Sequence, residues 1–158
     1  MAREERSAGF VVFRVAEQGM REYLLLDYGR HWDFAKGHVE KGEDDLTTAL
    51  RELQEETGIT TPRVVPGFQH EVIYFFKDRR KGLVRKRVVF FLGETKTAAT
   101  DVVISHEHEG FAFLPFDVAV KRLTFPTARQ ILKLAEQAAS RQQTEQDGDT
   151  LSFRPSAQ

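Results

Sequence analysis

The segment 43–58 constrains the fold most, because it specifies an amphipathic helix of unusual charge. Its apolar residues recur at i, i+3, i+4 and i+7 and form one stripe, made of Leu46, Ala49, Leu50 and Leu53. Acidic residues open the segment, where negative charge complements a helix dipole, and Gly58 follows it at the position of a C-terminal cap. We therefore expect a helix that packs its leucines inward.

The same helix concentrates negative charge on a second face. The residues from Glu43 to Glu56 include six carboxylates and one arginine. Glu52, Glu55 and Glu56 stand at i, i+3 and i+4, so they emerge together, roughly 120° from the leucine stripe. A hard divalent cation such as Mg²⁺ or Mn²⁺ would offset their repulsion, because it favours carboxylate oxygens. The alternative is a solvated acidic surface.

The rest of the chain predicts strands on both sides of this helix. Stretches rich in apolar, β-branched and aromatic residues occupy 8–15, 22–28, 63–76, 84–95, 102–105 and 110–116. Residues 31–43 suggest a short strand and a loop, and a second helix is expected from Pro126. We predict an α+β fold, an α/β/α sandwich on a mixed sheet, as one domain at 1–140. The polar tail at 141–158 is expected to be flexible.

Composition excludes several classes of protein. The chain has 158 residues, a net charge of −1 and no cysteine, which rules out disulfides and thiolate metal sites and makes the cytoplasm the default location. We expect no signal peptide and no membrane span. Charge is uneven, because residues 77–87 hold seven basic side chains and one acidic. This segment is either a solvated hairpin tip or a surface for a polyanionic substrate.

The spacing of the acidic segment resembles a known motif. Gly37, five residues, Glu43, seven residues, Arg51-Glu52-Leu53, one residue, Glu55-Glu56, one residue, and Gly58-Ile59 follow in order. All nine specified positions match the Nudix box, G-x5-E-x7-R-E-U-x-E-E-x-G-U, where U is a bulky aliphatic residue. The chain is thereby identified as resembling the Nudix hydrolases.

This resemblance implies a Nudix fold with a loop–helix–loop catalytic motif and a hydrolase of nucleoside diphosphates linked to a further group. It implies that Glu52, Glu55 and Glu56 bind metal and that the carbonyl of Gly37 is a further ligand. Arg51 and Glu43 would hold the motif together. The expected cofactor is Mg²⁺, for which Mn²⁺ can substitute.

Within this family the chain is similar to the asymmetrical diadenosine tetraphosphate hydrolases. The run "WDFAKGHVEKGE" at 32–43 matches their pattern, except that Ala35 replaces a proline. Lys36 would contact a phosphate, or it is a solvated loop residue, and His38 would line the substrate site. In "SHEHEGF" the resemblance makes Glu107 a fourth carboxylate of the metal site. The two flanking histidines could instead form a separate metal site.

The resemblance also implies that two aromatic rings sandwich the adenine. Tyr74 and Phe125 fall at the matching places, although Phe125 could equally be a core residue. Stacking on an aromatic ring contributes on the order of 1–3 kcal/mol per base. Lys86 is our first choice for a phosphate contact in the basic segment.

We therefore expect Mg²⁺-dependent hydrolysis of diadenosine tetraphosphate to ATP and AMP, with Glu55, Glu56, Glu107 and Arg51 as candidate catalytic residues. Alternative substrates are diphosphoinositol polyphosphates, RNA 5′ ends and nucleoside triphosphates. A nucleotide sensor without activity is a third hypothesis, disfavoured because no box glutamate is missing. We expect a small nucleotide as partner, no membrane, and no nucleic acid other than an RNA 5′ end. The sequence does not give the oligomeric state, and we favour a monomer.

Overall fold

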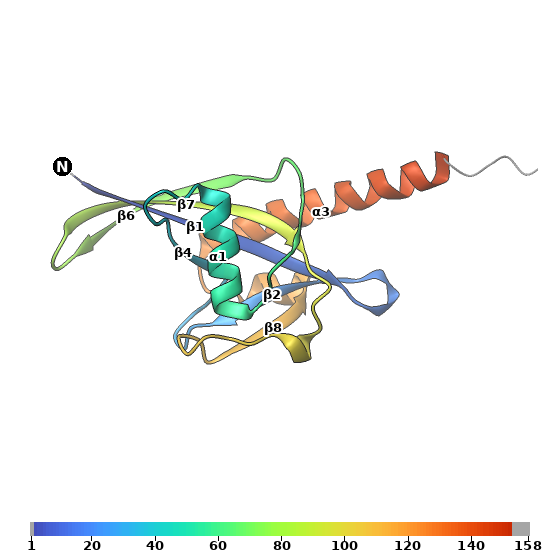
Figure 1. Ribbon diagram of the computed structural model, residues 1–158, viewed down its shortest axis with the longest axis horizontal. Helices are drawn as coiled ribbons and strands as arrows, with labels where there is room; N and C mark the ends of the chain where they lie inside the picture. Colours follow the sequence, from blue (N-terminus) through green and yellow to red (C-terminus); the bar gives the residue numbers. More distant parts are fainter. Residues whose placement is uncertain (1, 153–158) are drawn as a thin grey trace, which may run out of the picture.

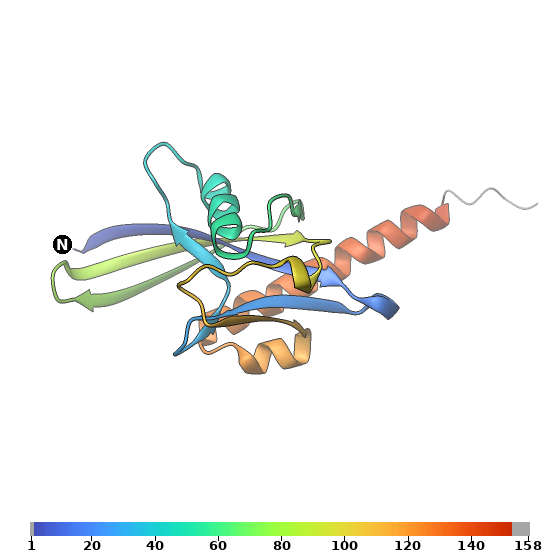
Figure 2. The same ribbon diagram turned by 60° about the horizontal axis from the view of Figure 1, so that its bottom comes forward.

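The computed structural model describes residues 2–152, with side chains as far as Gln146. It shows a mixed β-sheet with helices on both faces (Figures 1 and 2). The strands are β1 (Arg3–Val15), β2 (Arg21–Asp27), β3 (Trp32–Asp33), β4 (Ala35–His38), β5 (Arg63–Val64), β6 (His70–Asp78), β7 (Gly82–Glu94) and β8 (Gly110–Pro115). The helices are α1 (Asp45–Thr57), α2 (Phe116–Arg122) and α3 (Pro126–Ser152), with short 3-10 turns at Glu17–Gly19 and Ala99–Asp101. The predicted α+β sandwich is confirmed.

The long strand β1 organises the sheet. It runs parallel to β7, from the pair Arg3↔Val84 to the pair Phe13↔Glu94. On its other edge it pairs antiparallel with β4 near its middle and with β2 at its end. The outer strands β8, β5 and β6 also pair antiparallel with their neighbours. The parallel pairing of β1 with β7 makes the sheet mixed.

Alternation along β1 supplies two hydrophobic cores. Val11 and Phe13 face α2 and α3, where they pack with Ile131 and Leu132. Residues of the opposite parity, such as Phe10, face α1 and pack with the residues that include Ala49 and Leu53. Because neighbouring side chains of a strand point to opposite faces, one strand serves both layers.

Capping residues set both ends of helix α1. The Asp44 side chain accepts a hydrogen bond from the backbone N–H of Thr47 at 2.7 Å and caps the N-terminus. Gly58 adopts the left-handed conformation, φ 78°, and its N–H donates to the carbonyl of Gln54. The leucine stripe packs inward as predicted, with Leu53 fully buried.

Two predicted strands are wrong. The segment 63–76 is not one strand, because a turn at Pro66 and Gly67 separates β5 from β6. The segment 102–105 is irregular: the backbone N–H groups of Val103 and Ser105 donate to the carbonyls of Thr57 and Glu56 at the end of α1. Its apolar residues therefore cover a helix terminus and do not extend the sheet.

Two features of the C-terminal half were not predicted. Helix α2 lies between β8 and α3. Helix α3 continues beyond Ser140 to Ser152, a length that the sequence did not predict. The flexibility expected for 141–158 stays a prediction, and residues 153–158 lie outside the described residues. No helix in the part of the chain that the structure describes is long and apolar enough to cross a membrane.

Candidate active site

A cleft of about 670 Å³ lies between α1, β4 and the loop before β8. It is lined by Ser7, Lys36, Gly37, His38, Glu40, Glu52, Glu55, Glu56, Lys86, Ser105, His106 and Glu107. All of the metal-binding and phosphate-binding residues expected from the sequence are among them. Segments that are far apart in the chain therefore converge as predicted.

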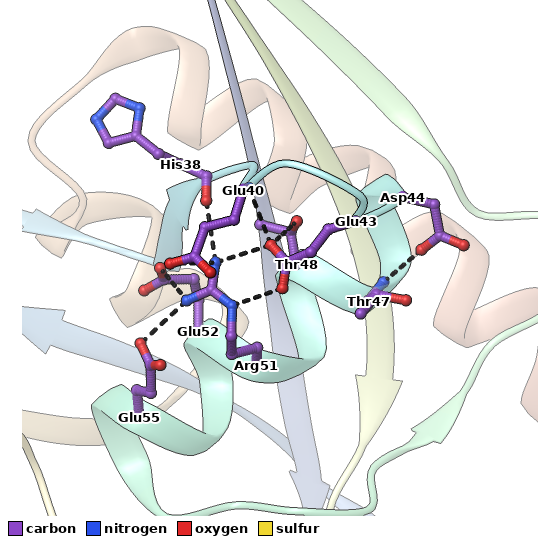
Figure 3. Close-up of polar contacts among 9 residues, drawn as sticks. All are labelled: His38, Glu40, Glu43, Asp44, Thr47, Thr48, Arg51, Glu52 and Glu55. Atoms are coloured by element: carbon purple, nitrogen blue, oxygen red, sulfur yellow. Dashed lines mark hydrogen bonds and ion pairs between the residues drawn. The ribbon is translucent and has the colours of Figure 1, made fainter.

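Arg51 braces the acidic motif (Figure 3). Its Nε donates to Glu43 Oε2 at 2.7 Å and its Nη2 to Glu43 Oε1 at 3.0 Å. Its Nη1 also contacts Glu52 at 2.9 Å and Glu55 at 3.2 Å, and its Nη2 donates to the carbonyl of His38 at 3.0 Å. Arg51 does not line the cleft, so this geometry favours positioning over direct participation in the reaction.

Glu43 ties the loop before α1 to the helix. Besides Arg51, it accepts hydrogen bonds from the Thr48 hydroxyl at 2.8 Å and from the Glu40 backbone N–H at 3.0 Å. The hydrogen bonds from Arg51 and then from the Glu40 backbone lower the pKa of Glu43 to about 2. Glu43 is therefore ionised at neutral pH.

Gly37 is required by close approach and not by an unusual backbone angle. A Cβ built on it would lie 2.0 Å from Cδ of Glu52. The strand pairing of Gly37 with Ala8 of β1 holds this backbone in place. Only glycine lets the Glu52 carboxylate lie against the backbone here.

Glu56 is the buried carboxylate of the cleft, only 5% exposed. Its Oε2 accepts a hydrogen bond from the backbone N–H of Lys36 at 3.2 Å. Burial, followed by repulsion from Glu52, raises the pKa of Glu56 to about 8. Burial also raises the pKa of Glu52, against the opposing effect of Arg51. The cleft therefore disfavours the ionised form of Glu56 unless a cation compensates its charge.

The loop before β8 brings Glu107 to this cluster from far along the chain. Ser105 is anchored to the carbonyl of Glu56, and its hydroxyl lies 2.9 Å from Nδ1 of His108. His108 is buried, with its ring against Tyr28 at 4.4 Å between centroids. His108 thus supports the loop that carries Glu107, and it does not line the cleft. These contacts make His108 a supporting residue.

The chemistry of the donor set fits a hard divalent cation. Glu52, Glu55, Glu56 and Glu107 offer carboxylate oxygens, and burial, followed by repulsion from neighbouring carboxylates, raises the pKa of Glu52 and Glu56. Among the side chains that the structure describes, however, no three Asp, Glu or His residues already stand in a metal-binding arrangement. Glu52 and Glu55 are bonded to Arg51 instead, so binding would require these side chains to turn.

A second pocket, of about 360 Å³, adjoins the cleft and is more apolar. Tyr74 and Phe125, the two aromatic residues expected to hold a base, both line it, together with Val72 and Phe90. Phe125 is 41% exposed, so it is not a core residue. Lys36 lines both pockets. One extended ligand could therefore occupy the apolar pocket and the acidic cleft together, with this lysine beside it.

The basic segment is neutralised more than its composition suggests. Lys81 and Lys86 lie 2.6 Å and 3.9 Å from Glu5, and Lys86 is half-buried. Burial lowers the pKa of Lys86. Lys86 reaches the cleft, as expected, whereas Lys81 does not line it. The segment therefore has one lysine that lines the cleft, while Lys81, Arg85 and Arg87 form ion pairs with acidic side chains.

Sequence reasoning missed two residues beside the cleft. Asp33 is buried and lies 2.9 Å from Nζ of Lys36, which it orients between the two pockets. Burial, and then the carboxylate of Glu56, raise the pKa of Tyr28, whose hydroxyl donates to the carbonyl of Phe34 at 3.0 Å. Asp33 could have been noticed in the sequence, because it is the one charged residue in the apolar run Trp32–Ala35. No feature of the sequence pointed to Tyr28.

Comparison with known proteins agrees with this site. The family model described as the NUDIX domain matches residues 5–135. Asymmetrical bis(5′-nucleosyl)-tetraphosphatases of Rattus norvegicus and Sus scrofa are each 34% identical over 142 residues, covering 84% of this chain and 93% of each relative. A solved binary complex of a C. elegans Ap4A hydrolase matches with a TM-score of 0.67 and 26% identity, over 82% of this chain and 93% of that chain. Enzymes of this family generally use divalent metal ions. The chain belongs to the Nudix hydrolase family.

Proposed function

We propose that the protein hydrolyses dinucleoside polyphosphates with Mg²⁺, and that diadenosine tetraphosphate is cleaved asymmetrically to ATP and AMP. The observation that carries this is the adjacency of an aromatic-lined pocket and a carboxylate-lined cleft, joined by Lys36. A base in the first pocket would deliver its phosphate chain into the second. The similarity to the asymmetrical tetraphosphatases supports the same substrate.

Each group in the two pockets has a chemical task in this proposal. Tyr74 and Phe125 hold the base, because aromatic faces stack on any nucleobase. Lys36 and Lys86 contact phosphate oxygens, and His38 lies beside them at the rim. Asp33 orients Lys36 through the ion pair between Oδ2 and Nζ. These contacts fix the phosphate chain in one register relative to the carboxylates.

Glu52, Glu55, Glu56, Glu107 and the carbonyl of Gly37 would hold the metal. When bound, Mg²⁺ would neutralise phosphate charge and acidify the attacking water. The carboxylates Glu55, Glu56 and Glu107 are all chemically able to accept the proton that the water loses. Arg51 and Glu43 keep α1 and the preceding loop in register, so that these carboxylates face the phosphate chain.

The first test is a product analysis with the purified full chain, MgCl₂ and diadenosine tetraphosphate. Equal amounts of ATP and AMP are expected. In water labelled with ¹⁸O, the labelled oxygen should appear in only one of the two products. Formation of two ADP molecules would contradict asymmetric cleavage. A side-by-side panel with a diphosphoinositol polyphosphate, a triphosphorylated RNA and nucleoside triphosphates tests the other substrates; faster turnover of any of these would overturn the proposed substrate.

The second test concerns the base pocket. Tyr74→Ala is expected to raise KM for diadenosine tetraphosphate about tenfold or more, because one stacking face is lost. Phe75→Ala is the matched control, since the neighbouring side chain of a strand points to the other face and Phe75 does not line the pocket. Equal KM values for Tyr74→Ala and the unaltered protein would exclude this pocket as the base site.

A further inference from the structure

Strand β6 is an exposed edge of the sheet with an unusually apolar middle. Among the residues that the structure describes, it pairs with β7 and with no other strand. The residues Ile73, Tyr74, Phe75 and Phe76 are 41%, 38%, 58% and 36% exposed. The run from Val72 to Phe76 contains no charge and no proline, which natural edge strands commonly use to prevent association. This edge could therefore pair with a strand of another chain.

The surroundings of β6 argue against a nucleic acid as the partner. The β6–β7 hairpin projects from the body of the molecule together with the start of β1 (Figures 1 and 2). Most of its basic side chains already have acidic partners: Lys81 and Lys86 pair with Glu5, Arg85 with Glu4, and Arg87 with Glu71 and Asp45. These pairs offset four of the seven basic side chains in 77–87, so the segment attracts phosphates less than its composition suggests.

The sequence of β6 is complementary to itself when reversed. If a second β6 runs antiparallel and Tyr74 lies opposite its own copy, His70 meets Asp78, and Lys77 meets Glu71, which also keeps its ion pair with Arg87 of its own chain. Between these charged ends, Val72 meets Phe76 and Ile73 meets Phe75, so apolar residues face apolar residues. Opposite charges stand at both ends and no like charges meet. A shift of one residue would place Glu71 opposite Phe76 and lose this match.

Backbone geometry permits this register. Two directly opposed residues of an antiparallel pair form either a hydrogen-bonded pair or a non-hydrogen-bonded pair. A two-fold axis can pass through the centre of either kind of pair, so two copies of Tyr74 can lie opposite each other in a regular sheet. Opposed residues point to the same face, so Tyr74 of both copies would lie on the side of the sheet that holds the aromatic pocket. The two apolar pockets of a dimer would then open on the same face.

We infer that two copies of this chain associate through antiparallel pairing of their β6 edges, centred on Tyr74, and form one continuous sheet. The contact is isologous, as two-fold dimers require, because each Glu71–Lys77 pair occurs twice. This inference does not rest on the proposed substrate, and it replaces the monomer that the sequence alone favoured. It predicts a concentration-dependent dimer, since one strand pairing is a small interface.

Sedimentation equilibrium of the full chain tests this between about 1 µM and about 200 µM. The mass is expected to rise from 18.1 kDa toward twice that value. Lys77→Glu places like charges opposite each other at both ends and should weaken the dimer about tenfold or more. Glu71→Lys should do the same. An equimolar mixture of the two variants should dimerise, because both charge pairs are restored in the heterodimer.

Val118→Lys is the control, since Val118 is an exposed apolar residue of α2, away from β6. It should dimerise as the unaltered chain does, and thermal melts of every variant check that the fold is kept. A mass of 18.1 kDa at all concentrations would overturn the inference, as would a mixture that stays monomeric. Binding of a single-stranded RNA of about 12 nucleotides that Phe75→Ala abolishes would assign the edge to nucleic acid instead.

Discussion

At the scale of single residues, the cleft depends on what Gly37 lacks. The Glu52 carboxylate occupies the space where any other residue would have its Cβ, with Cδ 2.0 Å from that position. Because the backbone of Gly37 is held in the sheet by Ala8, the end of the Glu52 side chain would have to move to relieve a contact this short. The position of one proposed metal ligand is therefore set by a glycine in another element.

Gly37→Ala should lower kcat for diadenosine tetraphosphate about 100-fold or more, because Glu52 must move by about an ångström. The fold should survive, since the added methyl group lies at the cleft and outside both cores. Gly110→Ala is the matched control, because a Cβ at Gly110 meets nothing within 4 Å. Activity of Gly37→Ala within twofold of the Gly110→Ala value would show that Glu52 need not lie there.

The ionised form of Glu56 destabilises the folded protein, and metal binding would relieve this destabilisation. Burial raises its pKa from the ordinary 4.5 to about 8. A raised carboxyl pKa gives stability that is fully present below pH 4.5 and is lost as pH rises through about 8. Without divalent metal, Glu56→Gln should therefore be more stable than the unaltered protein above pH 4.5, by a few kcal/mol at pH 8, because each pKa unit is worth about 1.4 kcal/mol.

Urea unfolding in EDTA at a series of pH values measures this difference. The two proteins should be equally stable near pH 4 and should diverge steadily up to about pH 8. Glu55→Gln, on the exposed side of the same helix, is the control and should show a smaller change. A difference that is constant with pH would mean that Glu56 is not strained by its surroundings. Loss of hydrolysis in Glu56→Gln is expected at every pH.

At the scale of elements, α1 and its preceding loop act as one unit through Arg51. A guanidinium can donate to Glu43 with two nitrogens while reaching Glu52, Glu55 and the His38 carbonyl (Figure 3). Lysine keeps the positive charge but presents a single nitrogen, so it cannot replace this fork. The loop and the helix would then lose their fixed register.

Arg51→Lys should lower kcat about 10- to 100-fold, as is typical when a residue that orients metal ligands is lost. KM should change little, because Arg51 does not line either pocket that holds the substrate. Arg63→Lys is the control, since Arg63 also bonds a glutamate, Glu94, but on an exposed part of the sheet. Equal kcat for the two variants would contradict the bracing role.

The elements that could be predicted are those set by local chemistry. Helix α1 follows from its apolar period, its Asp44 cap and its Gly58 terminus, which are readable within one segment. The irregular stretch at 102–105 was mistaken for a strand, because its apolar composition does not reveal that its N–H groups bond to Thr57 and Glu56. Likewise, the ion pair between Asp33 and Lys36 depends on the fold around it.

At the scale of the whole molecule, carboxylates from two distant segments meet in one cleft. Helix α1 supplies Glu52, Glu55 and Glu56, and the loop before β8 supplies Glu107. The repulsion among them opposes folding, because the unfolded chain holds them far apart. A cation that binds only the folded protein would offset this repulsion and stabilise the molecule.

Addition of MgCl₂ to metal-free protein should therefore raise the melting temperature, by about 5–10 °C when Mg²⁺ is near 100 times its Kd. Differential scanning calorimetry measures this without any substrate. Glu107→Gln should reduce the shift, whereas Glu109→Gln, two residues away and outside the cleft, should keep it. KCl at matched ionic strength separates binding from screening, since general screening of charges would act alike in all three proteins. An equal rise in melting temperature with KCl would exclude a specific Mg²⁺ site. Screening by any salt could then account for the whole effect.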